Sequence, residues 1–305
     1  MSRDRALIIA NPAASSFTGA AFREVSRVLS DRWDLEQHWP ESPSITHALT
    51  REAPERGITA VFAMGGDGVV HHAAQGLVGT DVPLGVIPSG TTNVLARILE
   101  LPSRAIAAGH HHLEATVRVV PTIRLTVEQE DGETTRTHAL FALGFGFDAD
   151  VVELAEAAGH RKRTLGAAHY AISTVRQFMG YVGRRPHAMV DVGDGPKDAV
   201  AAQVQLHDIY TFFGPIPLRA GPSSPGALTV ATYRKLTPWM LPGLAIGAVT
   251  GRGGQVRNVE VALDRSTVTI TAVDDPLHAQ ADGEPLGQVH SVIVDLAPDS
   301  LRVFA

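Results

Sequence analysis

The sequence predicts two domains: an N-terminal α/β domain with a doubly wound parallel sheet, and a C-terminal antiparallel β-sandwich or barrel. At 305 residues the chain is longer than one hydrophobic core usually supports. Before Val117, apolar runs alternate with helical patterns, which is typical of a parallel sheet covered by helices. After Val117, short segments alternate in period two, which is typical of antiparallel strands. The domain boundary is therefore expected near Pro121.

The strands of the N-terminal domain are predicted from short apolar or alternating runs that stop at turn residues. The first run stops at Asn11-Pro12, and the third and fourth stop at turns that contain glycine. The second run alternates in period two and ends at Trp39. These strands are expected at residues 6–10, 35–39, 59–64 and 84–87.

Helices are predicted between these strands from apolar residues at helical spacing and from capping residues. Thr18 or Ser16 is expected to cap the first helix, and Ser44 the second. A helix follows each of the two later strands, and Leu101-Pro102 closes the last of these. A further short helix is expected to end near His112.

The C-terminal domain is predicted from short alternating segments separated by turns. Two helical patterns interrupt them, at residues 151–158 and 165–182. The apolar segment at residues 239–246 is interpreted as a core helix, with an acyl-chain tunnel or a bilayer contact as alternatives. The strands are expected at residues 117–127, 138–144, 188–192, 200–207, 228–233, 256–261 and 267–272.

Composition excludes several classes of protein. Apolar residues make up 44% of the chain and charged residues 19%, which is the composition of a globular protein. The net charge of −6 carries no signature of nucleic-acid binding, so no nucleic-acid partner is expected. The absence of cysteine excludes disulfides and zinc–thiolate sites and fits a reducing cytoplasm.

The apolar segments also bear on localisation. The N-terminal apolar stretch is too short for a signal peptide. The longest apolar run, from Trp239 to Val249, contains Pro242 and is too short to span a bilayer. A cytoplasmic protein is therefore expected, with peripheral contact to any membrane.

Two glycine turns mark the candidate site. Gly65-Gly66-Asp67-Gly68 follows the third predicted strand, and a turn at residues 88–93 follows the fourth. Glycine turns that open helices present backbone N–H groups to phosphate, and a Cβ there would block the approach. Parallel strands place both turns at the same edge of the sheet. The chain has no Walker A, HRD or DFG motif. Phosphate binding is therefore expected from Gly65, Gly66, Gly68, Ser89 and Gly90.

The motifs and their order resemble the catalytic domain of the diacylglycerol kinase and sphingosine kinase family of lipid kinases, which includes bacterial members. GGDG at residues 65–68 and PSGTTNVLAR at residues 88–97 carry the resemblance. The family's opening NP turn, mid-chain GFGFDA motif and late DGE motif correspond to residues 11–12, 144–149 and 282–284. The resemblance covers nearly the whole chain. It implies an NAD kinase-like fold, with a nucleotide-binding domain of residues 1–121 plus about 291–305 and a lipid-substrate domain of residues 122–290.

The resemblance implies a kinase that uses ATP and Mg²⁺ to phosphorylate a lipid alcohol, with Asp67 and Glu284 as catalytic residues. Asp67 between glycines suits a Mg²⁺ contact, direct or through water, or acceptance of the substrate proton. A turn former or helix cap is the alternative for Asp67. By the resemblance, Glu284 faces Asp67 across a cleft between the domains, as general base or metal-linked partner. Without the resemblance, its QADGEP segment is typical of a hairpin turn.

Three further residues have implied roles. Thr91 and Asn93 match positions that contact phosphate or nucleotide in the family, and both are also suited to N-capping the helix from Val94. Asn11 is implied to border the adenine or phosphate pocket, with turn punctuation as the alternative.

Asp148 and Asp150 match positions where the family lines its lipid head-group pocket. An aspartate that opens a helix also stabilises the helix dipole, which is the alternative role. An ammonium-bearing sphingoid base would favour two carboxylates there, whereas a neutral diacylglycerol would not need them.

Two charged clusters have competing interpretations. Basic residues at 160–163, with Arg176, Arg184 and Arg185, form either a solvated helix face or a patch that steers the protein to anionic lipid. His110-His111-His112 has no partner ligands at metal-site spacing, so an exposed helix end is expected.

The chain departs from the family pattern at several positions, so four functions stay open. Val69 replaces the usual threonine after GGDG, His72 stands where an acid is common, and Val94 stands where diacylglycerol-type members often have aspartate. The first expectation is a kinase of diacylglycerol or a related glycerolipid. The alternatives are a kinase of sphingoid or other long-chain alcohols, a non-catalytic nucleotide- or lipid-binding relative, and an NAD kinase-type enzyme with a soluble substrate. A homodimer is compatible with each, and the residues do not decide the oligomeric state.

Overall fold

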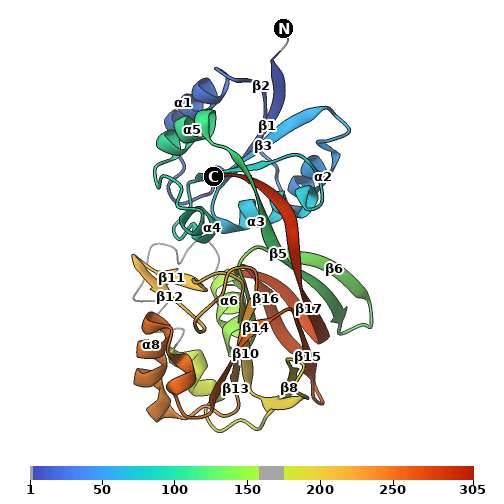
Figure 1. The fold of residues 1–305 in the computed structure, drawn as a ribbon, viewed down its shortest axis with the longest axis vertical. Helices are drawn as coiled ribbons and strands as arrows, with labels where there is room; N and C mark the ends of the chain where they lie inside the picture. Colours follow the sequence, from blue (N-terminus) through green and yellow to red (C-terminus); the bar gives the residue numbers. More distant parts are fainter. Residues whose placement is uncertain (1–2, 158–174) are drawn as a thin grey trace. The chain divides into compact units, whose positions relative to one another are not determined.

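The computed structural model describes residues 3–157 and 175–305, which form two compact units (Figure 1). Unit 1 comprises Met1–Thr122 and Ala297–Ala305, and unit 2 comprises Ile123–Leu296. The chain therefore passes from one unit to the other twice. The expected basic residues 160–163 and most of the expected helix at 165–182 lie outside the described residues.

Unit 1 is built on a parallel sheet. Its strands are β1 (Asp4–Ala10), β2 (Trp33–His38), β3 (Ile58–Gly65) and β4 (Leu84–Pro88), in the order β4-β3-β1-β2. The end of β17 (Glu284–Phe304) joins this sheet beside β4, where Val303 pairs with Leu84 in parallel. β1 and β3 are almost wholly buried, because helices cover both faces of such a sheet. The predicted doubly wound parallel sheet is confirmed.

Five helices connect the strands of unit 1. Thr18 caps the first, since its hydroxyl accepts a hydrogen bond from the Ala21 N–H at 3.1 Å. Ser42, and not the predicted Ser44, caps the second, because Pro43 occupies the first helical position and the Ser42 side chain accepts from Ile45 N–H. The helices are α1 (Gly19–Leu29), α2 (Pro43–Glu52), α3 (Asp67–Leu77), α4 (Val94–Ile98) and α5 (Ala105–Glu114).

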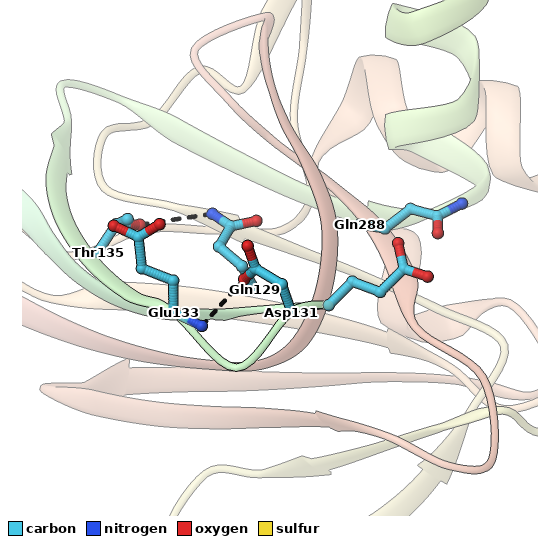
Figure 2. A pocket seen from close by; sticks show the side chains of 6 residues that line it. Gln129, Asp131, Glu133, Thr135 and Gln288 are labelled. Carbon is cyan, nitrogen blue, oxygen red and sulfur yellow. Dashed lines mark hydrogen bonds between the residues drawn. The ribbon is translucent and has the colours of Figure 1, made fainter.

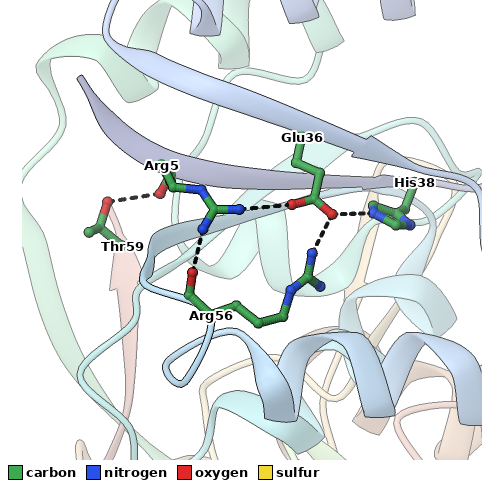
Figure 3. A network of polar contacts seen from close by, with 5 residues as sticks. All are labelled: Arg5, Glu36, His38, Arg56 and Thr59. Carbon is green, nitrogen blue, oxygen red and sulfur yellow. Dashed lines mark hydrogen bonds and ion pairs between the residues drawn. The ribbon is translucent and has the colours of Figure 1, made fainter. Parts of the chain in front are cut away.

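A polar network joins strands of this sheet (Figure 3). The Glu36 carboxylate on β2 accepts hydrogen bonds from Arg5, Arg56 and His38. Hydrogen bonds from His38 and Arg56 outweigh partial burial and hold the pKa of Glu36 below its usual range. Arg5 and Arg56 lie near the amino ends of β1 and β3, whereas Glu36 and His38 lie in the second half of β2.

The prediction that residues 110–112 form an exposed helix end is wrong for His112, which lies in α5. This residue is fully buried among Phe62 and Phe304, and its Nε2 lies 3.0 Å from the carbonyl oxygen of Val86. Burial lowers the pKa of His112 to about 4, because the surrounding core does not solvate an imidazolium. One histidine of the three, His112, is therefore a core residue.

His112 makes unit 1 sensitive to mild acid. The folded pKa lies below the ordinary unfolded value of about 6.5, so between pH 6.5 and 4 the unfolded chain binds the extra proton. The free energy of unfolding should therefore fall by about 3 kcal/mol across that window. Urea titrations followed by buried Trp33 should show this slope, and His112→Gln should flatten it. His110→Gln, an exposed neighbour, is the control; an equal flattening there would contradict the assignment.

Unit 2 is built on antiparallel strands around a second core. The path β14-β13-β10-β7-β16-β17 forms the main sheet, and the buried residues of its inner face include Phe145, Val204 and Val230. The predicted antiparallel β region is confirmed. The strands are β5 (Val117–Gln129), β6 (Thr134–Ala139), β7 (Ala142–Gly146), β8 (Ala188–Asp191), β9 (Lys197–Ala199), β10 (Ala201–Gln205), β11 (Thr211–Phe213), β12 (Ile216–Leu218), β13 (Leu228–Tyr233), β14 (Val259–Arg265), β15 (Thr267–Ala272), β16 (Leu277–Ala281) and β17.

Three predictions for unit 2 need correction. The strand expected at residues 138–144 is two strands, because the chain turns at Leu140-Phe141. The strand expected at 256–261 begins three residues later, at Val259. Short β9, the β11–β12 hairpin and β16 were not predicted, since segments of three to five residues are too brief for periodicity.

The helices of unit 2 are α6 (Phe147–Ala157), a helical stretch at residues 175–181, the 3₁₀ turn η2 (Pro238–Met240), α8 (Leu241–Thr250) and the 3₁₀ turn η3 (Gly253–Gln255). The core-helix interpretation of residues 239–246 is wrong in part, because Trp239 is 89% exposed and Ile246 is 65% exposed. Among the described residues, no helix is long and apolar enough to cross a membrane.

Candidate active site

Three turns lie together at the carboxyl ends of the parallel strands of unit 1. β3 and β4 end in register, with Gly65 paired to Pro88. The Ser89 N–H donates to the Gly65 carbonyl at 2.8 Å, and the Ser16 N–H donates to the Ser89 carbonyl at 2.9 Å. The structure thus brings together Asn11, Gly65, Gly66, Asp67, Gly68, Ser89, Gly90, Thr91 and Asn93.

Asp67 links the two glycine turns. It is the first residue of α3, and its Oδ1 accepts a hydrogen bond at 2.6 Å from the N–H of Val94, the first residue of α4. The carboxylate therefore sits at the N-termini of two helices, where the helix dipoles favour negative charge. The helix-cap alternative for Asp67 is thus realised, on a neighbouring helix.

Asn93 closes the second turn on itself. Its Oδ1 accepts from the Gly90 N–H at 2.9 Å, and its Nδ2 donates to the Gly90 carbonyl at 2.8 Å. Asn93 occupies the N-cap position of α4 in a left-handed conformation, but its side chain makes no capping bond. The expected capping by the Asn93 side chain is therefore wrong, because Asp67 takes that role. Thr91 is exposed at the tip of the turn, 2.9 Å from the Ser15 hydroxyl.

Asn11 shapes the first turn. Its side-chain Oδ1 accepts from the Ala13 N–H at 2.8 Å, and its own N–H donates to the Met64 carbonyl at 3.1 Å. The turn-punctuation alternative for Asn11 is therefore observed. Ser15 and Ser16, further along this loop, bond to the second glycine turn at Thr91 and Ser89.

Gly66 and Gly90 bring the two turns into backbone contact. A Cβ placed on Gly90 would lie 2.5 Å from the Gly66 Cα, a distance that real Cβ contacts essentially never show. Glycine is therefore required at this contact, because a Cβ would force the two turns apart.

Gly90→Ala is expected to separate the two turns and weaken nucleotide binding at least about tenfold, because the backbone must move to relieve the clash. Isothermal calorimetry with ATP measures the loss. Gly79→Ala, in an open loop where a Cβ meets nothing within 4 Å, is the control for a general glycine effect, although its positive φ adds local strain. Full ATP affinity in Gly90→Ala would show that the contact is irrelevant to binding.

The turns have the donors that a triphosphate requires. Ser89 is 2% exposed, and its hydroxyl has no hydrogen-bond partner among the described residues, which marks a position for a polar ligand. Asp67 supplies a carboxylate of the kind that holds Mg²⁺. Burial lowers the pKa of the nearby Arg97 guanidinium, while the Asp67 charge acts in the opposite direction. The residues present therefore fit ATP with Mg²⁺.

Asp148 in unit 2 is held inside a polar network. Its carboxylate accepts hydrogen bonds from Tyr210 at 2.5 Å, Gln280 at 2.7 Å and Gln203 at 3.2 Å. Gly144 makes room for it, since a Cβ there would lie 1.9 Å from Asp148 Oδ2. Asp148 therefore fixes α6 to the sheet, and the sequence alone did not reveal these amide and hydroxyl partners.

Asp150 points to a different set of partners. It accepts from the Tyr181 hydroxyl at 2.7 Å and lies 2.7 Å from Nδ1 of His278, which is also 2.8 Å from Glu153. Burial, followed by the bond to Asp150, raises the pKa of the Tyr181 hydroxyl. The three groups Asp150, Glu153 and His278 are close enough to share a cation, and the imidazole between the two carboxylates already accounts for their approach.

The late motif separates into a buried carboxylate and a strand residue. Asp282 is 4% exposed and accepts three backbone hydrogen bonds, from the N–H groups of residues 140, 141 and 142 at 2.7–3.1 Å. Asp282 and Gly283 both have positive φ, as a two-residue hairpin turn requires, and the predicted hairpin is observed. Glu284 begins β17 and is half-buried. Asp282 is thus the anchor of the motif, a role that sequence reasoning missed.

One pocket of about 740 Å³ opens over the β5–β6 turn (Figure 2). Three carboxylates, Glu130, Asp131 and Glu133, are among its six lining residues, and Gln129 and Asp131 are hydrogen-bonded within the turn. A wide-open acidic surface repels phosphate, so this pocket is not a nucleotide site.

Comparison with known proteins bears on both family and fold. Residues 5–125 match the model of the diacylglycerol kinase catalytic domain. A diacylglycerol kinase of Mycobacterium tuberculosis (strain H37Rv) is 52% identical over 56 residues, 18% of this chain and 18% of that protein. A diacylglycerol kinase of Bacillus subtilis (strain 168) is 44% identical over 63 residues, 20% of each chain. The aligned segments thus span about a fifth of these curated relatives.

Solved structures extend the likeness in fold to the whole chain. A diacylglycerol kinase from Bacillus anthracis str. Sterne has a TM-score of 0.73 at 19% identity and covers 100% of this chain and 98% of its own. Yeast NADH kinase, solved with NADH, has a TM-score of 0.51 at 10% identity and covers 100% and 84%. The NAD kinase-like fold is confirmed. Both glycine turns lie within the segment that matches the diacylglycerol kinase catalytic domain model, in line with the resemblance that the motifs carry.

Proposed function

We propose that the protein is a lipid kinase that transfers the γ-phosphoryl group of ATP to the hydroxyl of a lipid alcohol, with diacylglycerol or a related glycerolipid as substrate. The observation that carries the proposal is the Asp67 carboxylate fixed between two touching glycine turns at the carboxyl ends of parallel strands. The family match of this segment and the names of its relatives support it.

The residues of the turns have distinct tasks in this proposal. Backbone N–H groups of the Gly66–Gly68 turn bind phosphate oxygens, with the Ser89 hydroxyl as an added donor. The N–H groups of Ser89 and Gly90 already donate to the Gly65 carbonyl and to Asn93 Oδ1 and support the second turn. Asp67 would hold Mg²⁺, directly or through water, and a bound metal ion would supply positive charge to neutralise the phosphates. Glu284, by the resemblance, acts as general base or metal-linked partner. A carboxylate that accepts the substrate proton commonly raises the rate of the chemical step by two to four powers of ten.

Radiolabelled ATP tests the proposal against a panel of lipid alcohols in mixed micelles: diacylglycerol, monoacylglycerol, sphingosine and a long-chain isoprenoid alcohol. We expect Mg²⁺-dependent transfer to one of them, and stimulation by micelles. Transfer only to a soluble acceptor such as NAD would favour the NAD kinase-type alternative. ATP binding with no transfer to any acceptor would favour a non-catalytic relative, for which Val69 and His72 are the motivating residues.

A sphingoid or other amino alcohol is the second candidate substrate class, because Asp148 and Asp150 place two carboxylates at the start of α6. Asp150 is the better candidate for an ammonium contact, since Asp148 is enclosed by its three partners.

Asp150→Ala should raise the KM for sphingosine about tenfold while leaving the KM for ATP unchanged, because the loss of one charge contact costs roughly that factor. Steady-state kinetics on both substrates measure this. Glu153→Ala, which removes the other carboxylate beside His278, is the matched control. An unchanged KM for sphingosine would assign Asp150 to structure alone.

A further inference from the structure

Five large apolar side chains are exposed on one part of unit 2. Trp239 in η2 is 89% exposed, and Ile246 and Val249 on α8 are 65% and 44% exposed. Phe213 and Ile216, in the β11–β12 hairpin, are 38% and 42% exposed. We call these five side chains, together with the exposed cations Arg234, Lys235, Arg252 and Arg257, the apolar–basic face.

The hairpin and α8 are fastened together, so the five side chains belong to one surface. Arg219, directly after β12, donates its backbone N–H to the Ala248 carbonyl at 2.8 Å. Its Nη1 also donates to the Val249 carbonyl at 3.2 Å. Figure 1 shows β11, β12 and α8 on the same side of this unit.

α8 packs on the core of unit 2 and exposes further apolar side chains on its outer side. Met240 is buried, and Leu241 and Leu244 pack on the cluster that contains Phe178 and Val259. α8 therefore has one apolar side against the unit and a second apolar side facing outward. Its sequence, LPGLAIGAVT, has no charged residue.

The charged residues near this face are mostly basic, whereas the whole chain is acidic. Between Asp208 and Glu260 the sequence contains no aspartate or glutamate, although the whole chain has a net charge of −6. Arg234 and Lys235 precede η2, and Arg252 and Arg257 follow α8; all four are exposed. The acid beside the hairpin, Asp208, is paired with Arg219 at 2.8 Å. The excess of cations in this part of the sequence complements an anionic interface.

We propose that the apolar–basic face docks on a membrane surface that contains anionic phospholipid. Tryptophan prefers the headgroup level of a bilayer, and Ile246 and Val249 can enter the acyl boundary beside it. The flanking cations meet lipid phosphate, each adding to the attraction. This location differs from the basic cluster at residues 160–163 considered from the sequence. The proposal does not depend on kinase activity, since binding is measured without ATP.

Vesicle sedimentation with the full chain tests the docking. Binding should be strong to vesicles of phosphatidylcholine with phosphatidylglycerol and weak to phosphatidylcholine alone, and it should fall with added salt. Trp239→Ala with Ile246→Ser should lower the partition coefficient about a hundredfold, from about tenfold per apolar side chain. Arg252→Glu with Arg257→Glu should abolish the preference for anionic vesicles. Ile293→Ser, an exposed apolar residue on β17, is the control and should bind normally.

Tryptophan fluorescence gives a second readout. The exposed Trp239 should shift to shorter wavelength when anionic vesicles are added, and Trp239→Phe should remove the shift, since Trp33 is buried and Trp39 lies in unit 1. Unchanged vesicle binding by the folded Trp239/Ile246 variant would overturn the proposal. So would self-association of the wild-type chain that this variant abolishes, because the face would then be covered by a second copy.

Discussion

Asp67→Asn should reduce kcat for phosphoryl transfer about a thousandfold while leaving unit 1 folded. The amide oxygen of asparagine can still accept the Val94 N–H, so the bond between the two glycine turns persists. The negative charge that holds Mg²⁺ or accepts a proton is lost, and such groups contribute two to four powers of ten. Single-turnover transfer to diacylglycerol measures the effect.

Asp67→Ala separates the chemical role of this residue from its structural one. Alanine removes both the charge and the capping bond, so it should also lower the free energy of unfolding of unit 1, by about 1–2 kcal/mol more than asparagine does. Urea unfolding followed by Trp33 compares the two variants. Near-normal transfer by Asp67→Asn would end the assignment of Asp67 to catalysis and leave only the cap.

Asp282→Ala should destabilise unit 2 by about 3–5 kcal/mol, enough to unfold it in part. Three buried backbone N–H groups, of residues 140 to 142, lose the carboxylate that accepts their hydrogen bonds, and each unsatisfied buried donor costs about 1–3 kcal/mol. Hydrogen exchange of peptides from β7 and β10 should accelerate, while peptides from β1 and β3 should keep their protection.

Glu284→Gln, two residues further on, is the natural comparison. It keeps size and hydrogen bonding, so it should lower kcat by two orders of magnitude or more without changing exchange in β7. Unchanged hydrogen exchange of β7 and β10 in Asp282→Ala would show that the three hydrogen bonds add little to the stability of unit 2. A fully active Glu284→Gln variant would remove Glu284 from the proposed mechanism.

Much of the fold followed from the sequence because its signals are local. Apolar runs such as residues 59–64 predict a buried strand, and Thr18 predicts the start of α1, without knowledge of distant residues. Ser44 was predicted to cap α2, but Pro43 occupies the first helical position and places the cap at Ser42. Segments as short as β9 or β12 lack enough residues for any periodicity.

The site shows a similar division. The two glycine turns and their common edge of the sheet follow from strand–turn–helix patterns, so Gly65, Gly66 and Asp67 were identified from the sequence. The capping of α4 by Asp67 spans 27 positions, and the bonds of Asp282 span about 140, so no local pattern contains them. His112 and Trp239 were misjudged for the same reason, since a residue's own neighbours in sequence do not set its exposure.

By itself, the sequence determined the alternating strands and helices of unit 1, the antiparallel character of unit 2, the glycine turns and the resemblance of residues 5–125 to a diacylglycerol kinase catalytic domain. These depend on periodicity, backbone freedom and motif spacing, which are properties of neighbouring residues. Only the tertiary structure decided which polar groups are satisfied and which apolar groups stay exposed. Hydrogen bonding and burial join residues that are far apart in the chain, so they exist only once the chain has folded.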